Sequence, residues 1–197
     1  MLEVFRVMSE ILLDGPNWKK GKPEETAILV LPGMYQEYRI TEGTKFWPDQ
    51  GEYLWVAGTN GDPAYSRKQI ISVIDVDYPN DLHYPNIICG EFARHTLDQM
   101  EWCVSLLKEN TQVKHLIVTT AAYHLPRCTL TLLQVLTKSG MKIPITPLSI
   151  RNPSGDSFSP TSTEDLRSEV MKIQQYQEKG DVASLDTWRN YINWRIS

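Results

Sequence analysis

The amino-acid sequence predicts an α/β domain of the three-layer Rossmann-like kind, in which helices cover both faces of a mostly parallel sheet of about five strands. Short runs of apolar and β-branched residues alternate along the chain with segments of helical periodicity, an order typical of right-handed strand–helix–strand crossovers. The apolar runs are continuous rather than alternating, as expected for strands buried on both faces. With 197 residues, of which 41% are hydrophobic and 22% charged, the chain fits one globular domain.

The first fourteen residues predict an amphipathic helix, because their apolar side chains recur every three or four residues. These side chains are Val4, Val7, Met8, Ile11 and Leu12. Two glutamates interrupt the segment, and no basic stretch or small-residue cleavage site accompanies it, so we interpret it as a helix of the domain and not as a signal peptide. No apolar run approaches the ~20 residues that cross a bilayer, and we expect no membrane association.

The elements of the core follow in order along residues 26–150. The expected strands are Thr26–Leu31, Tyr53–Ala57, Asn86–Cys89, His115–Thr120 and Ile143–Thr146. The expected helices between them are Ser66–Ile74, Thr96–Glu109 and Pro126–Lys138. The second helix has a single apolar stripe. The third is apolar on most faces and is followed by Gly140, a type of residue that commonly ends helices.

A helical extension, 163–196, follows the core and completes a single domain that we expect to span residues 1–197. The segment Arg151–Thr163 is rich in proline, serine and glycine, which predicts a loop that acts either as a linker or as a flap over a pocket. Helices are expected at Thr163–Lys179 and in Ser184–Ile196. The last helix carries Trp188 and Trp194, which either pack on the domain or contact a partner.

Charge and cysteine content exclude several classes of protein. The formal net charge is −4, so the overall field of the molecule gives no reason to expect nucleic-acid binding. The three cysteines, Cys89, Cys103 and Cys128, are widely spaced, and no CxxC or Cys/His cluster is present. We therefore expect neither a zinc site nor a disulfide framework, and we expect a reducing, cytoplasmic location.

Ligands of open parallel sheets bind beyond the carboxyl ends of the strands, and four loops of this sequence leave strands in that direction. The candidate binding residues on these loops are Gly33, Arg39, Gly58, Thr59, Arg94, His95, Thr96 and Arg127, with His124 and Glu91 as candidate catalytic residues. Glycines permit tight turns and a close approach of backbone amides to a ligand. No GxGxxG or Walker A signature is present, so a standard dinucleotide or P-loop site is not supported.

The segment His124-Leu125-Pro126-Arg127 is the most informative of these loops. Proline favours the first position of a helix, which places His124 and Arg127 at a helix amino terminus, where free N–H groups and the helix dipole attract anions. A phosphate or carboxylate there would be bound by the guanidinium and the amides together. Otherwise Arg127 is exposed to solvent or paired with a carboxylate. Arg94 and His95 repeat the arrangement one crossover earlier.

Four segments of the sequence resemble the YdcF-like family, which includes YdcF, SanA and ElyC. The run LIVTTAAYHLPRCTLTLL is similar to the family's VTS-x-x-H-x-x-R segment, and GEFARHTLDQ resembles its E-x-x-S-x-N-T segment. AILVLPG followed by Arg39 resembles the family's opening strand and glycine turn, and LWVAGTNGD resembles its second strand and turn. Order and spacing agree over Ala27–Pro147. The resemblance implies a Rossmann-like fold with a polar pocket at the strand ends.

Carried over position by position, the resemblance implies functional roles for seven residues. These are Gly33, Arg39, Gly58, Glu91, Thr96, His124 and Arg127. Some members of the family have been linked to S-adenosylmethionine binding and others to cell-envelope precursor metabolism. The sequence departs from the family at Ala57, Ala93 and His95, where serine or asparagine is usual, and these changes indicate a different ligand or reduced activity.

Three functional hypotheses follow. The first is a hydrolase or transferase that acts on a phosphorylated or nucleotide-like small molecule, with Arg127 and Arg39 on the anion and His124 as acid or base. In it Glu91 orients His124 or accepts a sugar hydroxyl; a salt bridge with Arg127 is its structural alternative. The second is a non-catalytic module for S-adenosylmethionine or a nucleotide. The third is a degenerate scaffold that meets a partner through its aromatic tail.

Overall fold

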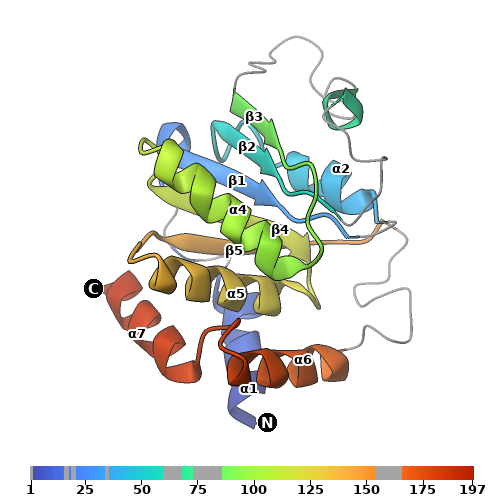
Figure 1. Ribbon diagram of the computed structural model, residues 1–197. Helices are drawn as coiled ribbons and strands as arrows, with labels where there is room; N and C mark the ends of the chain where they lie inside the picture. Colours follow the sequence, from blue (N-terminus) through green and yellow to red (C-terminus); the bar gives the residue numbers. More distant parts are fainter. Residues whose placement is uncertain are drawn as a thin grey trace.

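The computed structural model describes residues 2–15, 18, 21–33, 36–59, 68–72, 86–153 and 166–197. Its centre is a five-stranded sheet with every strand parallel to its neighbours, in the order β3-β2-β1-β4-β5 (Figure 1). The strands are β1 (Thr26–Val30), β2 (Tyr53–Val56), β3 (Ile87–Cys89), β4 (His115–Ala121) and β5 (Ile145–Ile150). The sheet confirms the predicted α/β fold, and the order reverses at β1, so the loops after β1 and β4 diverge there.

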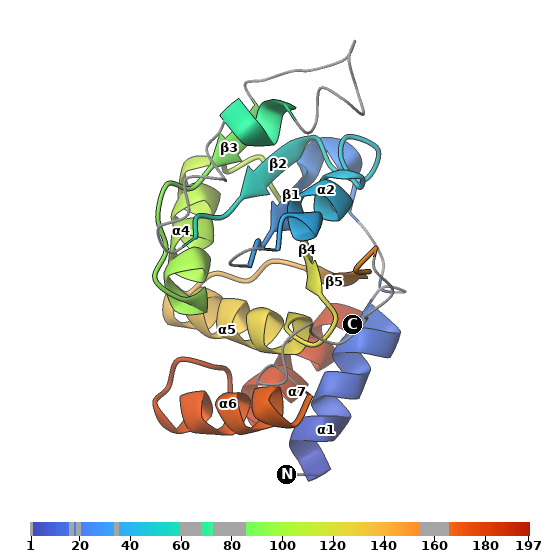
Figure 2. The ribbon, with the colours of Figure 1, turned by 90° about the vertical axis from the view of Figure 1, so that its right-hand side faces the viewer.

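Helices cover both faces of the sheet (Figure 2). The helices α4 (Thr96–Glu109) and α5 (Leu125–Lys138) lie on one face, and α2 (Tyr38–Thr44) lies on the other. Because successive strand side chains point to opposite faces, the two faces have separate cores. Leu29 and Trp55 contribute to the core under α4 and α5, and Val30 and Val56 to the core under α2.

The terminal segments pack together beside α5, below the sheet in Figure 1. They comprise α1 (Leu2–Ser9), the π-helical turn Glu10–Asp14, α6 (Leu166–Glu178) and α7 (Leu185–Ile196), while a 3₁₀ turn, Pro23–Glu25, leads into β1. Trp188 of α7 is 1% exposed and donates from Nε1 to Glu10 Oε2 at 2.9 Å. Tyr191 accepts a 2.7 Å hydrogen bond from the backbone N–H of Ile145 in β5. The closing helix therefore belongs to the core.

Three elements differ from the sequence-based expectation. The last strand begins at Ile145 instead of Ile143 and continues to Ile150. Pro147 within it suggests a break, but β5 is an edge strand, where a residue without an N–H is tolerated. Helix α2, with the sequence YRITEGT, is short and has little apolar periodicity, so its sequence does not predict a helix. Of the expected helix Ser66–Ile74, residues 68–72 are described and helical; its other residues, like 154–165, lie outside the described part.

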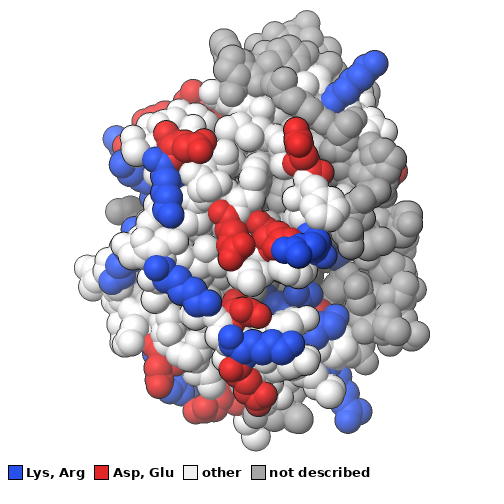
Figure 3. All heavy atoms as spheres, in the orientation of Figure 1, with Lys and Arg blue, Asp and Glu red and all other residues white. Residues whose placement is uncertain are grey.

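On the face shown in Figure 3, acidic and basic side chains are interspersed over the described surface. Within the described residues no helix has the length and apolar character needed to cross a membrane.

The burial of Trp188 generates a stability prediction. Replacing Trp188 with Ala removes a fully buried aromatic side chain and should lower the free energy of unfolding by about 3–5 kcal/mol, measured by urea denaturation. The exposed Asn193 on the same helix is the matched control, and its replacement with Ala should change the free energy by less than about 0.5 kcal/mol. Equal effects of the two variants would contradict the placement of α7 in the core.

Candidate functional site

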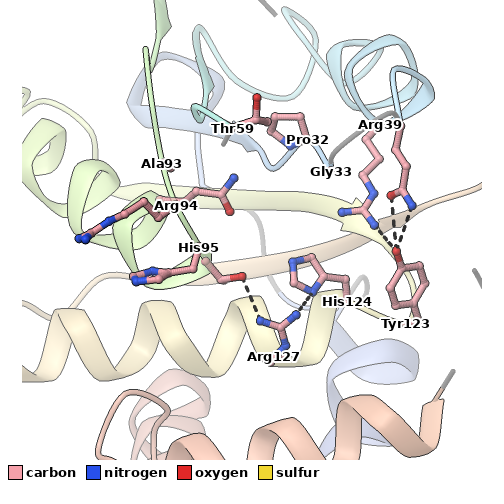
Figure 4. A pocket seen from close by; sticks show the side chains of 13 residues that line it. Pro32, Gly33, Arg39, Thr59, Ala93, Arg94, His95, Tyr123, His124 and Arg127 are labelled. Atoms are coloured by element: carbon pink, nitrogen blue, oxygen red, sulfur yellow. Dashed lines mark hydrogen bonds between the residues drawn. The ribbon is translucent and has the colours of Figure 1, made fainter. Parts of the chain in front are cut away.

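A cavity of about 260 Å³ opens at the carboxyl ends of the strands. All four predicted loops contribute to it, as expected for a parallel sheet. Its lining residues are Pro32, Gly33, Gln36, Arg39, Thr59, Ala93, Arg94, His95, Thr96, Gln99, Tyr123, His124 and Arg127 (Figure 4). The structure thus brings together eight of the ten residues predicted from the sequence; Gly58 and Glu91 are not among the lining residues.

The amino terminus of α5 positions two of the central side chains. The backbone N–H of His124 donates to Ala121 O at 2.9 Å, which closes a turn directly after β4. Pro126 lies in the first turn of the helix, where its missing N–H has no cost. The backbone N–H of Cys128 donates back to His124 O at 3.1 Å. This local structure follows the sequence closely and leaves His124 and Arg127 on the cavity side of the helix.

Arg127 is held by a buried ion pair with Glu169 of α6. Its Nε donates to Glu169 Oε2 at 2.7 Å and its Nη2 to Oε1 at 3.2 Å, a two-point contact that fits the planar guanidinium. Nη1 donates to Thr96 Oγ1 at 3.0 Å. Burial alone would raise the pKa of Glu169, but the interactions with His124 and with Arg127 outweigh burial and hold that pKa well below its usual range.

This ion pair settles the alternatives left open for Arg127. The guanidinium is neither exposed nor free, because Glu169, which is 1% exposed, neutralises its charge. Lys172 adds a second cation at 3.0 Å from Glu169 Oε1. Arg127 lines the cavity, as predicted, but its charge is already paired with Glu169. Its role in the described site is to join α5, α6 and Thr96 of α4.

His124 is buried beside the ion pair in a defined tautomer. Arg127 Nη2 lies 2.9 Å from His124 Nδ1, and a guanidinium only donates, so Nδ1 accepts. The neutral imidazole then carries its proton on Nε2, the nitrogen that faces the open space of the cavity in Figure 4. Burial, followed by the positive charge of Arg127, lowers the pKa of His124 to about 3. The sequence-based role of His124 as acid or base starts from its unperturbed pKa near neutrality, and the fold shifts that pKa downward by burial beside cations.

Arg39 is the second buried guanidinium, and it differs from Arg127 in having no acidic partner. It is 3% exposed, and the described residues place no carboxylate within ion-pair distance of it. Nη1 donates to Thr120 Oγ1 at 3.1 Å, Nη2 donates to the Tyr123 hydroxyl, and the guanidinium carbon lies 5.4 Å from the Tyr123 ring centre. Its buried Nε has no hydrogen-bond partner. Arg39 thus brings to the cavity wall a positive charge that no described carboxylate compensates.

Two glycines permit the close packing around these groups. A Cβ on Gly33 would lie 2.9 Å from Arg39 Cζ and 2.6 Å from Gln36 Oε1, so a side chain there would displace the guanidinium. A Cβ on Gly58 would lie 2.7 Å from the backbone N of Phe92. Gly58 O also accepts from Gln99 Nε2 at 2.9 Å. Gly33 therefore supports the site directly, whereas Gly58 allows the loops after β2 and β3 to touch.

Arg94 and His95 are tied to Asp98 at the start of α4. Arg94 donates from its backbone N–H and from Nε to Asp98 Oδ2, at 2.9 and 3.1 Å. His95 Nδ1 accepts from the Asp98 backbone N–H at 3.3 Å, so His95 caps the helix and Thr96 does not. Both side chains line the rim and are exposed. Because solvent and salt screen an exposed charge, a charge at the rim attracts an anion less strongly than a buried guanidinium does.

The carboxylate beside His124 is Glu169 and not Glu91. Glu91 is exposed and does not line the cavity, whereas Glu169 Oε2 lies 3.7 Å from His124 Nδ1. Sequence reasoning assigned Glu91 from the order of the loops and placed Glu169 in a helical extension outside the core. Tyr123, 2% exposed, was also missed, although it stands next to His124 in the same loop. No local signal marks Glu169, because only the folded chain brings α6 against α5.

The cavity has a positive lining. Three arginines and two histidines face it, and no aspartate or glutamate is among its described lining residues. Within the described part of the chain, no three His, Cys, Asp or Glu side chains gather as potential metal ligands. The arrangement can donate hydrogen bonds from Arg39, His124 and the amino terminus of α5 to a negatively charged group.

Comparison with known proteins adds no family assignment: no protein-family model matches the chain, and no curated protein matches it significantly.

The lowered pKa of His124 predicts a pH dependence of stability. The pKa of His124 in the folded protein lies below the ordinary value of 6.5. The contribution of the neutral imidazole to the free energy of unfolding is therefore complete above pH 6.5 and decreases as the pH falls below it. Down to the native pKa the unfolded chain binds one more proton, which lowers the free energy of unfolding by up to about 1.4 kcal/mol per pH unit.

The variant His124→Asn has no imidazole that could bind this proton. Its free energy of unfolding should therefore fall less steeply than that of the wild type between pH 6 and pH 4. Urea denaturation at whole pH units from 8 to 4 measures both slopes. Parallel profiles of wild type and variant over this range would show that His124 titrates normally in the folded protein.

Proposed function

We propose that the protein binds a phosphorylated small molecule in the cavity at the strand ends. The observation that carries this proposal is the burial of Arg39 without an ion-pair partner among the described carboxylates. Taking a guanidinium out of water costs several kcal/mol unless an opposite charge compensates it. A bound phosphate would provide that charge.

The surrounding groups fit the same ligand. The Nε2–H of His124 and the guanidinium of Arg39 approach the same space in Figure 4. The amino terminus of α5 adds the positive end of a fourteen-residue helix. Hydrogen bonds from charged and oriented donors to phosphate oxygens are among the stronger ones in proteins, so these groups together favour phosphate over a neutral ligand.

The positive lining favours phosphate over S-adenosylmethionine. The sulfonium of that molecule is a cation, and no carboxylate among the described lining residues would face it. A nucleotide remains within the proposal, because its phosphate can occupy the cavity. The burial of Trp188 in the core makes this side chain a poor contact for a partner and weighs against the scaffold hypothesis, whereas Trp194 is half-buried.

Membership of the YdcF-like family is part of the proposal. Its support is the meeting of Gly33, Arg39, Thr96, His124 and Arg127, all carried over from the motifs, around one cavity. Glu91 and Gly58 lie outside the lining, so those two motif positions give no further support.

Hydrolysis or transfer at phosphate is our second candidate function. Nε2–H of His124 faces the cavity, and a bound anion would raise the pKa of this imidazole, so that it could donate a proton to a leaving oxygen. Turnover of a panel of sugar phosphates and nucleotides should then vanish in His124→Asn while inorganic phosphate still binds. Turnover that survives this substitution would exclude His124 as the acid.

The binding proposal predicts a specific response to phosphate. Inorganic phosphate at about 100 times its dissociation constant should stabilise the wild type by about 2.7 kcal/mol, visible as a thermal shift. Arg39→Met should abolish the shift. Without phosphate, the same variant should be as stable as the wild type or more stable, because it removes an uncompensated buried charge.

The matched control is Arg94→Met. This arginine also lines the cavity but is 69% exposed and paired with Asp98, so its loss should weaken phosphate binding less than threefold. A wild type that shows no shift with phosphate, or an Arg39→Met variant that keeps the full shift, would refute the proposal.

A further inference from the structure

A second, smaller cavity of about 90 Å³ adjoins the first. His95, Thr96 and Arg127 line both, so the two cavities lie on either side of one wall. The hydrogen bond from Arg127 Nη1 to Thr96 Oγ1, at 3.0 Å, forms part of this wall. The side chain of His95 is 56% exposed, so the wall reaches the molecular surface there.

The smaller cavity shares His95 and Arg127 with the larger one but differs from it in having an acidic residue in its lining. It contains a carboxylate, Asp181, together with the Tyr176 ring and the apolar side chains of Leu97 and Val182. The carboxylate follows the end of α6, where the backbone N–H of Asp181 donates to Tyr176 O at 2.9 Å. The larger cavity, by contrast, has no acidic residue in its described lining.

Asp181 has no partner for its charge. Within the described chain, its side chain makes neither a hydrogen bond nor an ion pair. Lys179, two residues earlier, lies over the Tyr176 ring at 5.2 Å from its centre and makes no ion pair with Asp181. The carboxylate is therefore available to a ligand, as Arg39 is in the larger cavity.

We propose that the ligand carries a positive charge as well as a phosphate: a phosphomonoester whose ring bears a protonated amine, such as an amino-sugar phosphate. The phosphate would lie at Arg39 and His124, the body of the ligand would cross the wall, and the amine would pair with Asp181. The ring would pack on Tyr176, Leu97 and Val182. This inference rests on the proposed function and names its substrate class.

The test compares three probes by isothermal titration: inorganic phosphate, glucose 6-phosphate and glucosamine 6-phosphate. The wild type should bind glucosamine 6-phosphate about tenfold more tightly than glucose 6-phosphate, because a charge-assisted contact to Asp181 is gained. Asp181→Asn keeps a polar side chain of the same shape, and it should remove this preference while the dissociation constant for inorganic phosphate stays within twofold of the wild-type value.

Asp186→Asn is the matched control, because Asp186 is an exposed carboxylate on α7 that lies outside the lining of both cavities. It should retain the tenfold preference. If the wild type binds phosphate but does not distinguish the two sugar phosphates, or if Asp181→Asn keeps the preference, the amine inference is wrong and the phosphate site stands. If none of the three probes binds, the proposed function itself is wrong, and the inference with it.

Discussion

The buried ion pair between Arg127 and Glu169 is the interaction on which the site depends. It joins the amino terminus of α5 to α6, and through Thr96 it also contacts α4. Breaking such a pair by removing one partner leaves an uncompensated buried charge, which typically costs about 3–5 kcal/mol. Three helices that are separate in the sequence are therefore held in register directly at the cavity.

The same ion pair determines the chemistry of His124. With Arg127 donating to Nδ1, the imidazole proton stays on Nε2 and faces the cavity. The charges of Arg127 and, more weakly, of Arg39 both disfavour the protonated imidazole. Arg127 is paired with Glu169, whereas Arg39 has no carboxylate partner among the described residues. The two arginines thus have different roles despite similar burial: one stabilises the architecture, and the other leaves a positive charge for a ligand.

A buried charge without a partner is costly for folding, and such costs concentrate at sites where a ligand removes them. Arg39 is held in place although its Nε has no hydrogen-bond partner and its other contacts, to Thr120 and Tyr123, are neutral. The glycine at position 33 is required for this placement, since any side chain would meet the guanidinium. Gly33, Thr120 and Tyr123 therefore together hold the guanidinium of Arg39 at the cavity wall.

The sequence by itself determined the layered α/β fold, four of the five strand positions to within a residue or two, the helices α4 and α5, and the convergence of four loops on one edge of the sheet. These features follow from local periodicity and from the geometry of parallel strands. It also identified Arg39, His124 and Arg127, because glycine, proline and basic residues after strands leave a local signal.

Only the tertiary structure decided what these residues do. Glu169 lies 42 positions from Arg127 along the chain, and no sequence pattern in either segment predicts that the two side chains are in contact. The pKa of His124, the neutralisation of Arg127 and the exposure of Glu91 depend on which groups exclude water around each side chain. Burial and charge pairing depend on which distant segments pack together, so they cannot be predicted from local patterns in the sequence.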